Sequence, residues 1–218
     1  MMDPYVKELI IKGITETLQM TFFGTLFAYI GGLPLGVLLY LSARGHLFEN
    51  RAVNAVVGFA VNICRSLPFL ILLVLLIPFT RFVAGSSIGT TASIVPLTVG
   101  AVPIVARMVE SSLNEVPSGI IDAAQSMGAG PVFIVLHFIL PEAVPSLMLG
   151  GAINIATVLG YSAMAGVIGG GGLGAIALQY GYYRYEKKVL WVTVGLLVVM
   201  VMLIQEAGVS LSKRLRRS

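Results

Sequence analysis

Charge is the property that this sequence has least of. Only 11% of its 218 residues are Asp, Glu, Lys or Arg, whereas 57% are hydrophobic. The mean hydropathy of +0.94 lies outside the range of soluble globular proteins. The composition therefore excludes an ordinary soluble domain and indicates an integral membrane protein.

Cysteine and histidine are almost absent as well. Cys64 is alone, and the two histidines, His46 and His137, stand far apart in the sequence. This pattern supports neither a disulfide framework nor a zinc site. The glycine-rich run at residues 169–174 is not followed by the Lys-Ser/Thr of a P-loop, so the sequence offers no nucleotide site. We expect no metal and no cofactor in this chain, and no catalytic residues.

Acidic residues are missing from the interior of the apolar runs and occur only at their edges. An ion-coupled secondary transporter would show internal repeats and polar or acidic groups near the middle of the bilayer. We therefore rank that class of transporter low.

Long apolar runs are what the sequence does contain. A helix needs roughly 20 apolar residues to cross a bilayer, and backbone groups in lipid must be satisfied within their own segment. The runs are too long and too uniform for barrel strands. They predict an all-α membrane protein with about five transmembrane helices. Four runs are uncharged, and a fifth is interrupted only by Arg65: residues 17–43, 82–106, 143–183, 189–205 and 51–81.

Residues 123–141 are also uncharged but are too broken to span a membrane. The first half is small and polar, and the apolar half covers only residues 132–140. We predict two short helical pieces with a bend between them. Ser118 is expected to cap the first piece, Asp122 to lie in its first turn, Gly128 to close it and Pro131 to open the second. One side of the first piece is expected to be apolar and to fit a groove on a partner, through Ile120, Ile121, Ala124 and Met127.

The distribution of basic residues predicts the orientation. The cluster of Lys213, Arg214, Arg216 and Arg217 favours a cytoplasmic C-terminus. An odd number of spans then places the N-terminus outside and the loop at residues 111–141 in the cytoplasm. We expect an extracytoplasmic segment at residues 1–16 without a cleavable signal peptide, a transmembrane domain at residues 17–210 and a basic tail at residues 211–218.

Three further features have both a functional and a structural interpretation. Arg65 is a costly charge inside an apolar run, and it either serves function or forms a structural ion pair with Glu110 or Glu142. Tyr161, Ser162 and Met164 suit either a narrow passage or plain packing. The glycines at residues 169–174 fit a tight turn or close helix packing at the outer face, or else a flexible outer gate.

The loop carries a specific motif. Asp122-Ala123-Ala124, then Gly128, then Leu140-Pro141 resembles the EAA loop of ABC importer permeases. Asp122 stands where that family usually has Glu, and Phe138 where it favours Ile. The resemblance implies that these six motif residues couple the chain to a separate ATPase.

The resemblance extends over nearly the whole chain. Residues 62–79, 88–110 and 158–183 look like the methionine-importer permeases, which are small type I subunits. It implies a homodimer in the bacterial inner membrane, two cytoplasmic ATPase subunits that hold ATP and Mg, an extracytoplasmic substrate-binding (lipo)protein, and no nucleic-acid partner. For such a homodimer we predict that Tyr161, Ser162 and Met164 lie at the dimer axis, near a closed gate of the translocation pathway. A permease for quaternary amines such as glycine betaine is the alternative within the same superfamily.

Overall fold

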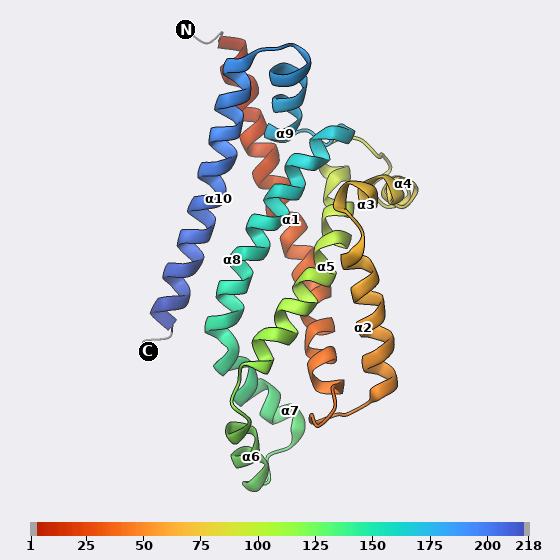
Figure 1. Cartoon of the computed structure of the whole chain (residues 1–218), viewed down its shortest axis with the longest axis vertical. Helices are drawn as coiled ribbons and strands as arrows, with labels where there is room; N and C mark the ends of the chain where they lie inside the picture. Colours follow the sequence, from red (N-terminus) through yellow and green to blue (C-terminus); the bar gives the residue numbers. More distant parts are fainter. Residues whose placement is uncertain (1–3, 216–218) are drawn as a thin grey trace.

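The computed structural model describes residues 4–215, and within that range every regular element is a helix (Figure 1). In chain order, the elements are α1 (Pro4–Ser42), α2 (Arg51–Ser66), α3 (Phe69–Leu75), α4 (Ile77–Ala84), α5 (Thr90–Asn114), α6 (Ser118–Ser126), α7 (Pro131–Ile134), the π-helix η1 (Val135–Ile139), α8 (Leu140–Ala165), the 3-10 turn η2 (Gly166–Ile168), α9 (Gly172–Ile176), the π-helix η3 (Ala177–Tyr183) and α10 (Lys187–Leu215).

Four helical segments of the described chain are long and apolar enough to cross a membrane. They are formed by α1, α5, the continuous stretch Pro131–Ile168, and α10. The bent pair of α2 and α3 raises the number to five. The prediction of an all-α membrane protein with about five transmembrane helices is confirmed.

The first helix begins well before its apolar run. The expected start was residue 17, but α1 starts at Pro4 and has 39 residues. Val6 and Ile10 are buried against Leu173 and Ile176, while Lys7, Glu8 and Lys12 are exposed. Hydropathy alone missed these turns because only one side of the helix is apolar.

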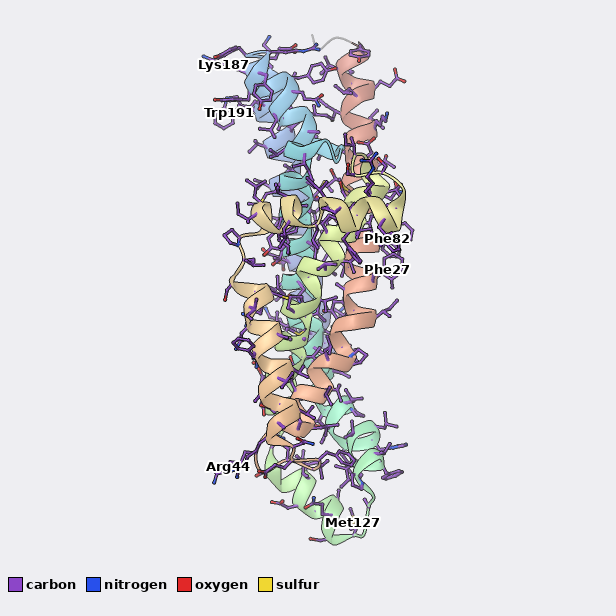
Figure 2. All side chains as sticks on the ribbon, turned by 90° about the vertical axis from the view of Figure 1, so that its right-hand side faces the viewer. Phe27, Arg44, Phe82, Met127, Lys187 and Trp191 are labelled. Carbon is purple, nitrogen blue, oxygen red and sulfur yellow. The ribbon has the colours of Figure 1, made fainter. Side chains whose placement is uncertain are left out.

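The run at residues 51–81 is not one straight span. The helix axis turns by 102° between α2 and α3. Leu67 precedes Pro68 and is extended, which is the conformation that a following proline favours, and Pro68 occupies the capping position of α3. As a result α2 runs along the bundle, whereas α3 and α4 lie across it (Figure 2).

The second half of the loop at residues 111–141 is continuous with the span that follows it. Helix α7, η1 and α8 form one helical stretch, so the prediction of a separate short helix before that span is wrong. The wider π turn ends just before Pro141, which has no N–H and whose ring would press on the carbonyl of residue 137 in a regular α-helix. The wider turn accommodates the proline without breaking the helix.

The core forms where α1 and α5 touch almost backbone to backbone. A Cβ on Gly32 would lie 2.8 Å from the Val102 carbonyl oxygen, and one on Gly36 would lie 2.5 Å from the Ala106 carbonyl oxygen. Small residues allow such close packing between membrane helices. Helix α5 is therefore the central helix, and Leu97, Val105 and Val109 on it are almost completely buried.

Candidate functional site

The loop at residues 111–141 projects beyond one end of the bundle. Helices α6 and α7 form the projection, and Met127 lies at its tip (Figures 1 and 2). The C-terminal end of α10 points toward the same end, whereas Lys187 and Trp191 lie at the opposite end. This arrangement agrees with the expected shared side of loop and tail, although Arg216 and Arg217 of the tail lie outside the described residues.

Gly128 closes α6 in the way the sequence predicted. It has a φ of 78°, which is the left-handed conformation that glycine adopts without a Cβ penalty. Its N–H donates to the Gln125 carbonyl at 2.9 Å, and the Ala129 N–H donates to the Ala124 carbonyl at 3.1 Å. These two bonds make a Schellman motif, which ends the helix and sets the direction of the chain into α7. Pro131 is the first residue of α7, as expected.

The start of α6 differs from the prediction. The capping position is Pro117, Ser118 is already helical, and no side chain caps the helix. Asp122 is the fifth residue of α6 and not in its first turn. Its side chain is exposed, so it faces away from the bundle rather than serving its own helix terminus.

The motif residues divide between two surroundings. Ala124 is fully buried, because a methyl group is small enough for α6 to lie against η1 and the bundle. Asp122, Ala123, Gly128 and Pro141 are exposed, and Leu140 is half-buried. Ile120 and Ile121 pack on the core, whereas Met127 is 72% exposed, so the predicted single apolar side is wrong at Met127.

An exposed apolar surface lies beside the motif. We call it the loop patch, and its members are large hydrophobic side chains at the projecting end: Met127, Val132, Phe133 and Leu136. His137 stacks on Phe133 with ring centroids 4.1 Å apart and stiffens this surface. Large exposed apolar side chains gathered on a projecting loop are typical of a surface that binds a protein partner. Sequence reasoning missed the patch members after residue 131, although the short apolar run at residues 132–140 was their signal.

Tyr161, Ser162 and Met164 do not share one surface. The Tyr161 ring stacks on Phe69 at the start of α3, with ring centroids 3.9 Å apart. Ser162 is 1% exposed and donates to the Leu159 carbonyl of its own helix at 2.7 Å. Met164 is 47% exposed. In this conformation only Met164 reaches outward, and Ser162 is not available to line a passage.

Arg65 has neither of its predicted partners. It is exposed near the end of α2, and among residues 4–215 no ion pair involves it. Glu110 instead pairs with Arg107 at 2.7 Å. The Arg107 guanidinium also donates to the Asn62 side-chain oxygen at 2.9 Å and to the Gly58 carbonyl at 3.2 Å. The Arg107–Glu110 pair therefore lies within α5, and the two hydrogen bonds of Arg107 join α5 to α2 without any part played by Arg65.

The glycine run is packed tightly in this conformation. A Cβ on Gly174 would collide with the Ala163 backbone, and one on Gly170 would lie 2.8 Å from the Ala165 carbonyl oxygen. These contacts bear out the close-packing interpretation of the glycines. Within the described residues, no cluster of His, Cys, Asp and Glu side chains has the arrangement of a metal site.

Comparison with known proteins identifies the chain's relatives. The family model of the binding-protein-dependent transport system inner membrane component matches residues 32–217. A probable D-methionine transport system permease protein of Pasteurella multocida is 47% identical and is covered over 98% of both chains. The corresponding protein of Vibrio cholerae is 46% identical over 95% of this chain and 92% of its own length.

Solved structures agree with the sequence relatives. One structure of the MetNI methionine ABC transporter, in an inward-facing conformation, has a chain that matches with a TM-score of 0.96 and 48% identity, over 98% of this chain and 99% of that chain. An amino acid ABC transporter solved with histidines matches with a TM-score of 0.80 at 21% identity, over 95% of this chain and 94% of that chain, which shows a shared fold. Because the family model covers most of the chain and the relatives align over nearly all of it, the chain belongs to the family of inner membrane components of binding-protein-dependent transport systems and is a multi-pass permease subunit.

Proposed function

We propose that this chain is the membrane-spanning subunit of an ATP-driven methionine importer. Near full-length identity to permeases named for D-methionine transport carries the substrate assignment. The loop patch beside Asp122 and Ala123 supports a motor partner, because an exposed apolar surface outside the bilayer is otherwise unfavourable. ATP and Mg belong to that partner, since this sequence has no P-loop.

We further infer the assembly and the mechanism. Two copies of the chain enclose the pathway, two ATPase subunits bind the loop patches, and an extracytoplasmic binding protein delivers the substrate. When ATP closes the ATPase pair, the two loops approach each other. The helices attached to them then rock, which converts the inward-facing arrangement into an outward-facing one.

Uptake in proteoliposomes tests the function. The chain is purified with its ATPase and binding protein, and uptake of radiolabelled methionine is measured with ATP on the ATPase side. We expect uptake that needs ATP and is insensitive to ionophores. Uptake of glycine betaine but not of methionine would instead support the quaternary-amine alternative, and uptake driven by an ion gradient without ATP would contradict the importer assignment altogether.

Cross-linking tests the homodimer and the pathway. Met164→Cys should form a disulfide across two chains, because this side chain is exposed near the end of α8. Ser162→Cys is the matched control and should stay unreactive, because Ser162 is buried within its own chain. Failure of Met164→Cys to cross-link, together with labelling by a lipid-soluble probe, would place Met164 against lipid.

A further inference from the structure

Two side chains of α1 hold the start of α9. The Glu16 carboxylate accepts the Gly172 N–H at 2.7 Å, and the Thr17 hydroxyl accepts the Leu173 N–H at 2.9 Å. Thr17 in turn donates to the Gly13 carbonyl of its own helix at 2.8 Å, which fixes the direction of its lone pairs. The bonded residues are 156 positions apart in the chain.

The glycine segment depends on these acceptors because it has none of its own. Gly171 occupies the capping position of α9 and has no side chain to accept the first amides of that helix. A Cβ on Gly171 would lie 2.7 Å from a Glu16 carboxylate oxygen. Glycine at this position therefore admits the carboxylate, and the carboxylate replaces the missing cap.

The same segment is tied to two other helices. The Gly169 carbonyl accepts the N–H of Gly89, which precedes α5, at 3.0 Å, and the Gly170 N–H donates to the Ala165 carbonyl of α8 at 2.9 Å. Residues 169–174 thus form a junction between α1, α5 and α8, one helical turn from the exposed Met164. Without Glu16 and Thr17, the junction would lose the two hydrogen bonds that its Gly172 and Leu173 amides donate to α1.

The burial of Glu16 shows that its carboxylate needs a partner inside the protein. The Glu16 side chain is only 24% exposed and immediately precedes the uncharged run of α1. A charge at this depth is costly unless it is paired or hydrogen-bonded. Lys12 lies 3.9 Å away but is 73% exposed, so its ion pair contributes little. The bond to the Gly172 amide is the main interaction that satisfies Glu16.

We propose that Glu16 is a positioning residue for the outer end of the transport pathway. Through the Gly172 amide it joins α1 to the glycine segment, so that α1, residues 169–174 and the end of α8 move as one body when the transporter changes conformation. The proposal rests on the permease function but not on the identity of the substrate.

Three variants in the full complex with its ATPase and binding protein test the proposal. Glu16→Ala removes the acceptor, Glu16→Gln keeps a neutral oxygen acceptor, and Lys12→Ala removes only the exposed ion pair. Loss of a hydrogen bond to a charged group should lower ATP-driven methionine uptake by about tenfold or more in Glu16→Ala. Glu16→Gln should recover most of the uptake, and Lys12→Ala should match the wild type.

Hydrogen–deuterium exchange gives a readout that does not depend on transport. The Gly172 amide should exchange about tenfold faster in Glu16→Ala than in the wild type or in Lys12→Ala, because its bond to Glu16 protects it. Uptake by the wild type in the same vesicles separates the methionine assignment from the positioning role of Glu16. If the wild type transports another substrate, the variants are compared with that substrate and only the methionine assignment fails.

Wild-type uptake and exchange in Glu16→Ala would overturn the positioning role, and so would uptake in Glu16→Gln as low as in Glu16→Ala. If Glu16→Ala does not assemble, Glu16→Asp decides the question, since it keeps the charge but withdraws the oxygen by one methylene. Wild-type uptake by Glu16→Asp would then contradict the proposal, and reduced uptake by an assembled complex would support it.

Discussion

Gly128 holds a backbone conformation that few side chains tolerate, and the direction of the chain after α6 depends on it. With a φ of 78°, a residue with a branched Cβ would be strained by about 1–2 kcal/mol or more. We expect Gly128→Val to insert normally but to lose most co-purification of the ATPase, because the Schellman turn that orients α7 is lost.

Gly130→Ala is the matched control for that variant. Gly130 has a φ of −68°, and nothing lies within 4 Å of an added Cβ. Gly130→Ala should therefore bind the ATPase as the wild type does. Equal ATPase recovery with Gly128→Val and the wild type would show that the turn does not set the coupling geometry.

Asp122 makes a second prediction at this scale. Its carboxylate is exposed and lies beyond the first turn of α6, so it adds little to the stability of its own helix. Asp122→Asn should leave the melting temperature of the isolated chain unchanged and weaken ATPase binding several-fold, measured by titration in detergent. A lower melting temperature with unchanged binding would mean that Asp122 serves the fold and not the partner.

At the scale of elements, α7 and η1 have some side chains in the exposed loop patch and others in the core. Leu136 is exposed in η1, whereas the neighbouring Ile134 and Ile139 are fully buried. We expect Leu136→Ser to leave the chain folded and to reduce both ATPase binding and stimulated hydrolysis. Ile134→Ala should instead destabilise the chain by about 2–5 kcal/mol, the usual cost of truncating a buried aliphatic side chain. A folded Leu136→Ser chain with full ATPase binding would remove the patch from the interface.

Most elements could be predicted from the sequence, because long apolar runs, helix-ending residues such as Gly128 and helix-starting residues such as Pro131 act locally. The early start of α1 could not, since Val6 and Ile10 become core residues only when α9 packs on them. The same applies to the proposed pathway. The sequence shows that Ser162 is small and polar, but only the rotation of α8 determines that it faces inward while Met164 faces outward.

At the scale of the whole molecule, we predict that the two ends of the bundle face opposite sides of the membrane. The C-terminal ends of α5 and of the described part of α10 point the same way, toward the end of the bundle that carries the loop patch (Figure 1). A periplasmic phosphatase reporter fused after Asn114 or after the C-terminus should be inactive, and one fused after Arg184 should be active. An active fusion after Asn114 would reverse the orientation of the entire chain.

The unbroken helix from Pro131 to Ile168 has a mechanical consequence. At 1.5 Å per residue, its 38 residues make a rod of about 57 Å that carries the loop patch near one end and Met164 near the other. If such a rod pivots near its middle, a tilt of about 10° shifts each end by about 5 Å in opposite directions. A displacement of the loop patch would then move Met164 directly, by tilting of the helix and without a relay of side chains. The size of the movement at Met164 would depend on how well the π turn and Pro145 resist bending.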